Sequence, residues 1–395
     1  MHLTSIKVKN FKALRDVSID NIPQFMVLVG ANGSGKSTFF SLFGFLGDAL
    51  RNNVRQALQK RGGFNEVVSR GYADQTILIE LKFRMQLLDR ERLVTYLVEI
   101  GKGPNSQPVV VKEILRYKRG PQGKPFHFLQ FSSGQGYAIS NEEDFNKPDE
   151  ELTRENQTLD SPDILALKGL GQFQRFKAAS AVRSLIENWH LSDFHISAAQ
   201  GSKDAGYAEH LSADGDNLPL VTQYLYESHP ELFQQVLDKM TRRVPGVAKV
   251  EAVPTADGRI VLRFQDGTFK DPFVSRFVSD GTIKMFAYLV LLHDPTPHPL
   301  LCVEEPENQL YYSLLGELAE EFQDYARRGG QVVVSTHSPD FLDAVPLDSI
   351  FWLEKQDGFS TVARAADDQQ LAALIREGDL PGRLWAQKLF GKVDP

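Results

Sequence analysis

The residues with the clearest capacity for chemistry form a glycine-rich stretch near the N-terminus. Residues 30–38 read Gly-Ala-Asn-Gly-Ser-Gly-Lys-Ser-Thr, the pattern G-x-x-x-x-G-K-[ST] of a phosphate-binding loop, or P-loop. Its glycines let backbone N–H groups point at phosphate oxygens, Lys36 brings a cation to the β- and γ-phosphates, and the Ser37 hydroxyl can ligate Mg²⁺. We therefore expect a nucleotide site built from Gly30, Asn32, Gly33, Ser34, Gly35, Lys36, Ser37 and Thr38.

Acidic residues follow an apolar run in the last third of the chain. Residues 300–303 lead directly into Glu304, Glu305, Pro306 and Glu307. Adjacent carboxylates at the end of a buried strand are costly unless a metal or hydrogen-bond donors neutralise them. We expect Glu304 to ligate Mg²⁺ and Glu305 to polarise an attacking water, as acids do in P-loop enzymes. The alternative is a charged surface turn.

Two further polar clusters stand next to apolar runs. Residues 332–334 end at Ser335, Thr336 and His337, and a histidine placed there could hydrogen-bond a γ-phosphate. Ser279 and Gly281 precede the apolar run 283–292, so they could bind an anion at the start of a helix. A structural histidine and a plain helix cap are the alternatives.

Lys12 and Arg15 lie near the P-loop in sequence. We count Lys12 as a candidate nucleotide contact. Solvated surface charge is the alternative for both residues.

The elements that must position these residues alternate between strands and helices. Residues 25–29 form a short apolar strand before the P-loop, and residues 38–60 are expected to be helical. An antiparallel meander is expected from strands at 76–84, 93–100, 109–117 and 126–131. We expect a loop at 140–163, a helix at 164–188 with an interruption near 169–171, a strand at 189–196, two helices within 217–243 and a hairpin at 250–264.

Composition fits an ordinary globular protein of 395 residues with a formal net charge of −7. The single cysteine, Cys302, lies in an apolar run and indicates core packing in a reducing compartment. We find no secretory leader and no apolar run long enough for a membrane span, so we expect a cytoplasmic protein without a membrane partner. The net charge argues against a strongly basic nucleic-acid coat, although a local basic groove stays open. The basic groups of the chain are scattered over residues 112–119, 175–177 and 242–243.

The order of these motifs resembles the ABC-type ATPases of the SMC/RecF/OLD superfamily, above all the compact prokaryotic "AAA family ATPase" proteins grouped with RecF and OLD. The opening residues 6–12, Ile-Lys-Val-Lys-Asn-Phe-Lys, also match the family's first strand and turn. By this resemblance, residues 30–38 are Walker A, 279–282 the signature motif, 304–305 Walker B with its catalytic glutamate, 308–310 the D-loop, and His337 the switch histidine. Two departures stand out: Glu304 replaces the usual aspartate, and Ser-Asp-Gly-Thr replaces Ser-Gly-Gly-Gln. Candidates for the Q-loop are Gln56, Gln59 and residues 62–66.

The resemblance implies one α/β ABC-type P-loop ATPase head over residues 1–395. It would have a mixed core sheet, an antiparallel β lobe and an inserted helical lobe, and no long coiled coil. We expect a nucleotide-binding and β lobe at 1–140, an acidic loop and helical insertion at 141–245, a lobe with signature, Walker B and switch histidine at 246–345, and strands and helices that complete the core at 346–395.

The resemblance also implies an ATPase that uses ATP and Mg²⁺, with Glu305, His337 and Lys36 as catalytic residues. Ser279 and Gly281 would complete the nucleotide site of a second copy, so the chain would dimerise head to tail around ATP. We expect such a switch to control a separately encoded nuclease or toxin in prokaryotic anti-phage defence. The alternative is a RecF-like repair ATPase that binds DNA directly.

Overall fold

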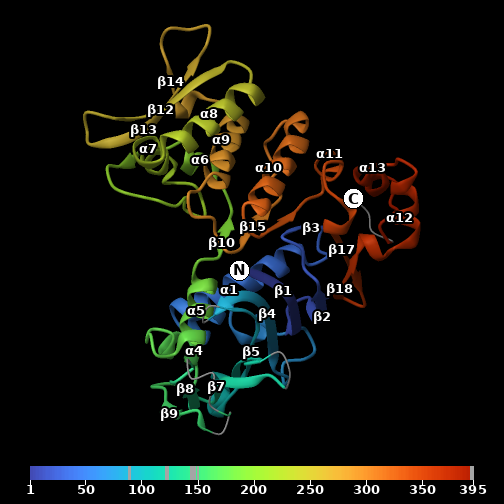
Figure 1. Cartoon of the computed structure of the whole chain (residues 1–395). Coiled ribbons are helices and arrows are strands. Elements are labelled where there is room, and N and C mark those ends of the chain that lie inside the picture. Colours follow the sequence, from blue (N-terminus) through green and yellow to red (C-terminus); the bar gives the residue numbers. More distant parts are fainter. Residues whose placement is uncertain (88–89, 121–123, 143–147, 149–150, 392–395) are drawn as a thin grey trace.

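The computed structural model describes residues 1–87, 90–120, 124–142, 148 and 151–391. It divides into a lower part dominated by a large sheet and an upper part of helices around a small sheet, with a third sheet between them (Figure 1). Part of the acidic stretch expected at 140–163 lies outside the described residues.

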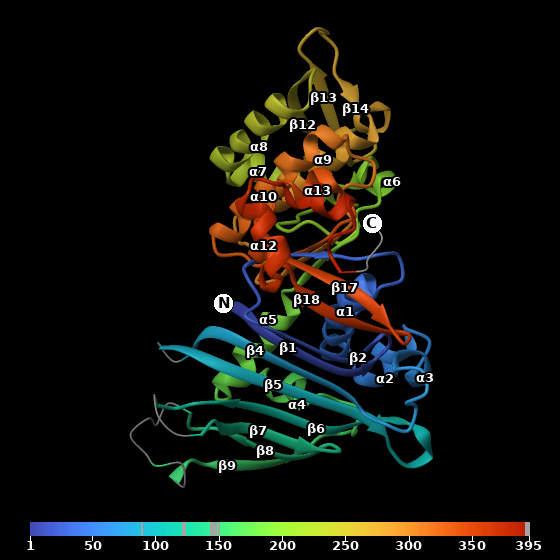
Figure 2. The ribbon, with the colours of Figure 1, turned by 90° about the vertical axis from the view of Figure 1, so that its right-hand side faces the viewer.

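The large sheet has eight antiparallel strands in the order β2-β1-β4-β5-β6-β7-β8-β9. Figure 2 shows it across the bottom of the molecule. Alternate residues of β4 are buried, which is the period expected of a strand with one face against a core. The strands are β1 (His2–Phe11), β2 (Leu14–Asp20), β4 (Ile77–Leu87), β5 (Arg90–Lys102), β6 (Pro108–Tyr117), β7 (Phe126–Ser132), β8 (Gln135–Ile139) and β9 (Arg154–Thr158).

The central sheet has six strands in the order β10-β15-β16-β3-β17-β18. The first five run parallel, and β18 pairs antiparallel with β17. Two strands of the C-terminal tail therefore belong to the central sheet. The strands are β3 (Phe25–Val29), β10 (His190–Ser192), β15 (Leu301–Glu304), β16 (Val332–Ser335), β17 (Ile350–Gln356) and β18 (Phe359–Arg364).

Two hydrophobic cores enclose the central sheet, one on each face. Met26 and Leu28 of β3 join the core under the large sheet, whereas Phe25, Val27 and Val29 join the upper core. Such alternation follows from the two-residue period of a strand. Helix α1 (Lys36–Arg51) is buried along most of its surface in the lower core, and its four phenylalanines all lie there.

The upper part holds a small sheet of β11 (Lys203–Asp204), β12 (Val247–Pro254), β13 (Arg259–Asp266) and β14 (Phe273–Val274), packed with helices. Its helices are α6 (Ile196–Ala199), α7 (Leu218–Ser228), α8 (Pro230–Arg243), α9 (Asp280–Leu292) and α10 (Leu315–Arg327). Helices α2 (Val54–Gln59), α3 (Phe64–Val67), α4 (Ala166–Leu170) and α5 (Lys177–Glu187) belong to the lower part, and α11 (Pro339–Leu342), α12 (Gln369–Arg376) and α13 (Pro381–Ala386) follow the central strands. Short 3-10 turns lie at Pro104–Ser106, Ser275–Phe277, Tyr312–Leu314, Leu347–Ser349 and Ala365–Asp367.

The predicted fold class is confirmed: a mixed central sheet, an antiparallel β lobe and helices. The longest helix of the described residues is α1, with 16 residues, so the described chain contains no long coiled coil. The lobe boundaries at 140, 245 and 345 stay predictions. The elements of 141–245 divide between the two cores, because α5 packs below the central sheet and α7 above it.

Two local predictions were wrong. The helix expected at 38–60 stops at Arg51, because Asn53 adopts an extended conformation and caps a new helix, α2. Residues 154–158 form β9 on the edge of the large sheet instead of a loop. By contrast, the interruption expected near 169–171 in the helix at 164–188 is confirmed, because α4 ends at Leu170 and α5 begins at Lys177.

The split between α4 and α5 has a physical cause in the large sheet. Neither helix begins at a residue whose side chain caps it. Instead, Glu113 of β6 accepts hydrogen bonds from the N–H groups of Ala166 and Leu167, at 2.6 and 2.9 Å. Glu142 accepts from the N–H of Ala178 at 3.0 Å. Each helix therefore starts where a distant carboxylate satisfies its free N–H groups.

Among the described residues, every helix is too short or too polar to cross a bilayer.

Candidate active site

The predicted chemical residues meet at one edge of the central sheet. Because β3, β15 and β16 are parallel, their carboxyl ends lie together. The P-loop follows β3, Glu304 is the last residue of β15, and Ser335 is the last residue of β16. Leu28, Ser335 and Glu304 occupy the same level of the paired strands. The sheet thus brings together three motifs that lie far apart in sequence.

The P-loop has the backbone that a phosphate cradle requires. Gly35, at the start of α1, has a φ of 112°, and an added Cβ would lie 2.2 Å from Ser360 Oγ. An added Cβ at Gly30 would lie 2.6 Å from both the Leu353 carbonyl and Ser34 Oγ. Glycine is therefore required at both positions. Ser34 Oγ is buried without a hydrogen-bond partner, as suits a hydroxyl that is free to bind a phosphate.

Lys36 lies inside this cradle. Its Nζ donates to the carbonyl oxygens of Gly30 at 2.7 Å and Ala31 at 3.3 Å. Burial lowers the pKa of Lys36, while Glu305, Glu307 and Glu304 act in the opposite direction. The ammonium group is thus within electrostatic reach of all three acids.

Glu304 and Ser37 form the part of the site that suits a hard cation. Burial raises the pKa of Glu304, and a hydrogen bond from Ser37 acts against this rise. The neighbouring carboxylates Asp193 and Glu305 also raise the pKa of Glu304. A serine hydroxyl and a carboxylate in contact, with other acids nearby, make an oxygen donor set of the kind that Mg²⁺ prefers. The residues present therefore fit the expected metal.

Glu305 and His337 face each other across the site. The distance from His337 Nε2 to Glu305 Oε1 is 3.3 Å. Burial is the main cause that lowers the pKa of His337, so the imidazole is neutral at neutral pH. Glu305 has a φ of 44°, a left-handed conformation that is uncommon for a residue other than glycine. Strain of this kind persists where the surrounding structure holds a side chain in place.

Glu307 ties the acidic loop to the histidine loop. Its Oε1 accepts hydrogen bonds from Thr336 Oγ1 at 2.9 Å and from the His337 N–H at 2.6 Å. On the other side, the indole N–H of Trp385 donates to the His337 carbonyl at 3.3 Å. His337 is thus held from both directions, by the loop after β15 and by helix α13.

The signature residues lie apart from the P-loop of the same chain. Ser279 is exposed and accepts a hydrogen bond from the Thr282 N–H, so it caps α9. An added Cβ at Gly281 would lie 2.9 Å from the Gln309 carbonyl, and Lys284 Nζ donates to the Asn308 carbonyl at 2.7 Å. Among the described residues, no hydrogen bond joins Ser279 or Gly281 to residues 30–38. The signature instead packs against residues 308–310.

Lys12 lies beside α1 and contacts it one helical turn after the P-loop. Its Nζ donates to Ser41 Oγ at 3.4 Å, and Ser41 is four residues after Ser37. The candidates for the Q-loop lie beyond α1: Gln56 and Gln59 belong to α2, and residues 62–66 lead into α3.

Sequence reasoning missed Asp193 and Lys284. Asp193 directly follows β10, whose end is level with Val303, so it stands at the same edge as Glu304. Lys284 is buried on α9, and burial lowers its pKa, whereas Glu307, Asp193 and Glu305 act in the opposite direction. The sequence did contain a signal for Asp193, because this residue lies at the strand expected over 189–196. A polar residue that follows a core strand lies at the edge of the sheet where ligands bind. Lys284 gave no such signal within its apolar helix.

Comparisons with known proteins identify the family and the fold of the chain. A family model described as "AAA domain, putative AbiEii toxin, Type IV TA system" matches residues 25–343. No curated protein matches the sequence.

Among solved structures, the chain is similar to an SMC head bound to the C-terminal winged-helix domain of ScpA. Identity is 13%, the TM-score is 0.54, and the match covers 92% of this chain and 98% of that one. It is also similar to an SMC head with an extended coiled coil bound to the C-terminal domain of ScpA from Pyrococcus furiosus. There identity is 12%, the TM-score is 0.51, and coverage is 95% and 99%. At these identities the likeness shows a shared fold.

Proposed function

The chain belongs to the family of AAA domains described with the AbiEii toxin of type IV toxin–antitoxin systems, and on that premise we propose that it is an ATP-hydrolysing switch. The observation that carries this proposal is the meeting of Lys36, Glu305 and His337 at one sheet edge, since P-loop catalysis needs positioning and charge stabilisation more than covalent chemistry.

Each residue takes a role that follows from its surroundings. The nucleotide phosphates would lie in the cradle of residues 30–38, and Lys12 would approach them from beside α1. Ser37 and Glu304 would hold Mg²⁺, which neutralises charge on the phosphates. Glu305 would orient the attacking water, and neutral His337 would donate a hydrogen bond towards the γ-phosphate.

We also propose that the active form is a head-to-tail dimer. Among the described residues, Ser279 and Gly281 make no hydrogen bond to their own P-loop, and they line a cavity of about 480 Å³ with Thr282 and Tyr311. Phe277, Tyr311 and Tyr312 flank it and are between 69% and 73% exposed. Exposed aromatic side chains grouped around a polar cavity are typical of an interface. A second copy would place its ATP against this surface, and the pair would be isologous.

We further propose that the switch controls a separate effector, a nuclease or toxin, in anti-phage defence. The family's description, with its toxin and its type IV system, supports this context. The two SMC heads of similar fold were solved with a domain of ScpA bound, which is a precedent for a separate protein partner.

The dimer is tested with Glu305→Gln, which keeps the shape of the side chain and removes the charge needed for hydrolysis. We expect this variant to form a stable dimer with ATP and Mg²⁺ and to remain monomeric without nucleotide, as measured by light scattering. Lys36→Ala is the matched control, because it should lose ATP binding and stay monomeric. A monomer of Glu305→Gln with bound ATP would exclude the dimer but leave the nucleotide site intact.

A further inference from the structure

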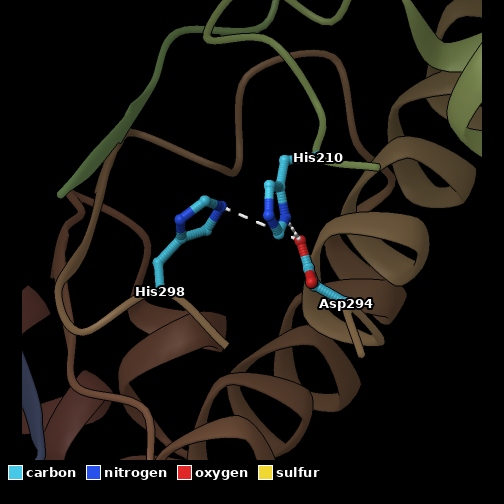
Figure 3. Close-up of side chains that lie close together, drawn as sticks. All are labelled: His210, Asp294 and His298. Carbon is cyan, nitrogen blue, oxygen red and sulfur yellow. Dashed lines mark hydrogen bonds and ion pairs between the residues drawn. The ribbon is translucent and has the colours of Figure 1, made fainter. Parts of the chain in front are cut away.

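Three metal-ligating side chains converge at a second place in the molecule, away from the nucleotide site. His210 lies in the loop between β11 and α7, Asp294 follows the end of α9, and His298 precedes β15 (Figure 3). We propose that His210, Asp294 and His298 bind one Zn²⁺ ion. This site lies at the start of β15, whereas Glu304 lies at its end.

The distances suit a single tetrahedral ion. His210 Nδ1 lies 2.7 Å from Asp294 Oδ2, and His298 Nε2 lies 3.9 Å from the same oxygen. All three ligand atoms lie within 4.8 Å of one another. Nitrogen and oxygen ligands about 2.0–2.1 Å from a tetrahedral Zn²⁺ are about 3.3 Å apart, so small side-chain rotations would bring all three side chains to one ion, with a water molecule as the fourth ligand.

Apart from the hydrogen bond between His210 and Asp294 within the cluster, the local hydrogen bonds leave the inward atoms available. His298 Nε2 has no hydrogen-bond partner although it is buried, and the other side of this ring bonds to the backbone of Asn188. Asp294 Oδ1 accepts from the Thr296 N–H at 2.8 Å, which leaves Oδ2 to face the histidines. Ligands oriented by a second hydrogen bond in this way are characteristic of metal sites.

Charge supports the same assignment. The side chain of Asp294 is only 4% exposed, and its ion-pair partners among the described residues are two histidines, not lysine or arginine. A buried carboxylate is costly without a counter-charge, and Zn²⁺ would supply one. His190, stacked on His298 at 4.6 Å, adds a second buried imidazole nitrogen without a partner.

Such an ion would join three segments that are distant in sequence. It would fix the loop of His210 to the end of α9 and to the connection entering β15. Since α9 begins at the signature residue Ser279, a metal at its far end would anchor the helix that presents the signature. We assign the ion a structural role in this anchoring.

The test is zinc binding by the full chain after treatment with a chelator. We expect one Zn²⁺ per chain, measured by titration against a chromophoric chelator, and a higher melting temperature with Zn²⁺. His210→Ala and Asp294→Asn should each weaken binding at least about tenfold. His195→Ala is the matched control, because His195 is exposed and lies outside the cluster.

Co²⁺ provides a second readout, since tetrahedral Co²⁺ gives visible absorption that the His210→Ala variant should lack. Circular dichroism shows whether each variant is folded. Failure of the wild-type chain to bind zinc, or equal binding by the wild type and folded His210→Ala, would overturn the proposal and leave His210 and Asp294 as a hydrogen-bonded pair. Neither measurement depends on ATP hydrolysis.

Discussion

At the residue scale, Glu307 is the side chain on which the position of His337 depends. Its Oε1 accepts from both Thr336 Oγ1 and the His337 N–H. We expect Glu307→Ala to leave these donors without a partner and to release the histidine loop. The turnover number for ATP should then fall about tenfold or more, whereas ATP affinity should change much less.

Glu307→Gln is the matched control for this prediction. A glutamine keeps an oxygen that can accept both hydrogen bonds, so most of the turnover should return. Steady-state kinetics and a nucleotide-binding titration measure the two quantities separately. Equal losses for alanine and glutamine would mean that the charge of Glu307, not its hydrogen bonds, is what matters.

Sequence alone could identify the residues of the motifs but not the residues that position them. The pattern of residues 30–38 defines a phosphate loop wherever it occurs between a strand and a helix. Glu307 and Lys284 act through partners 30 and 24 residues away. Residues so far apart in sequence come into contact only when the central sheet and α9 pack together. The local sequence pattern does not predict such packing.

At the element scale, the start of α4 depends on a carboxylate from the large sheet. Burial is the main cause that raises the pKa of Glu113 from its ordinary 4.5 to about 7. Between these values the folded chain holds a proton that the unfolded chain has released. The free energy of unfolding should therefore fall as pH rises from 4.5 to 7, by at most about 3 kcal/mol from this group.

Glu113→Gln should remove this part of the pH dependence, because glutamine cannot ionise. Urea unfolding at several pH values between 4.5 and 8 measures it. Glu91→Gln, on the exposed side of β5, is the control and should keep the wild-type slope. If the free energy of unfolding of Glu113→Gln depends on pH as it does in the wild type, protonation of Glu113 is not the cause of that dependence.

The same carboxylates explain which elements could be predicted. Strands of the large sheet follow their alternating pattern, and the hairpin of β12 and β13 follows its Asp257-Gly258 turn. The interruption between α4 and α5 was predicted near 169–171, but its cause could not be, because Leu165 and Phe176 are poor caps and the true caps come from Glu113 and Glu142. A capping interaction between residues that are distant in sequence cannot be predicted from the local sequence.

At the scale of the whole molecule, the charges favour a protein partner over DNA. Several basic residues that a DNA groove would need are already paired with acids. Arg116 pairs with Glu80, Arg175 with Glu155, and Arg243 with both Glu317 and Glu321. The formal net charge of −7 also opposes electrostatic attraction between the chain as a whole and a phosphate backbone.

The nature of the partner can be tested with the Glu305→Gln protein recovered from its native host. Because the variant should stay in the ATP-bound state, it should retain whatever that state binds. We expect mass spectrometry to identify a nuclease or toxin in stoichiometric amount, and the Lys36→Ala protein to recover less of it. Recovery of nuclease-sensitive DNA without a protein partner would contradict the effector proposal and favour a repair ATPase that binds DNA directly. Dimer formation by the purified variant is measured independently. Neither outcome of the recovery experiment therefore decides whether the protein is an ATP-dependent switch.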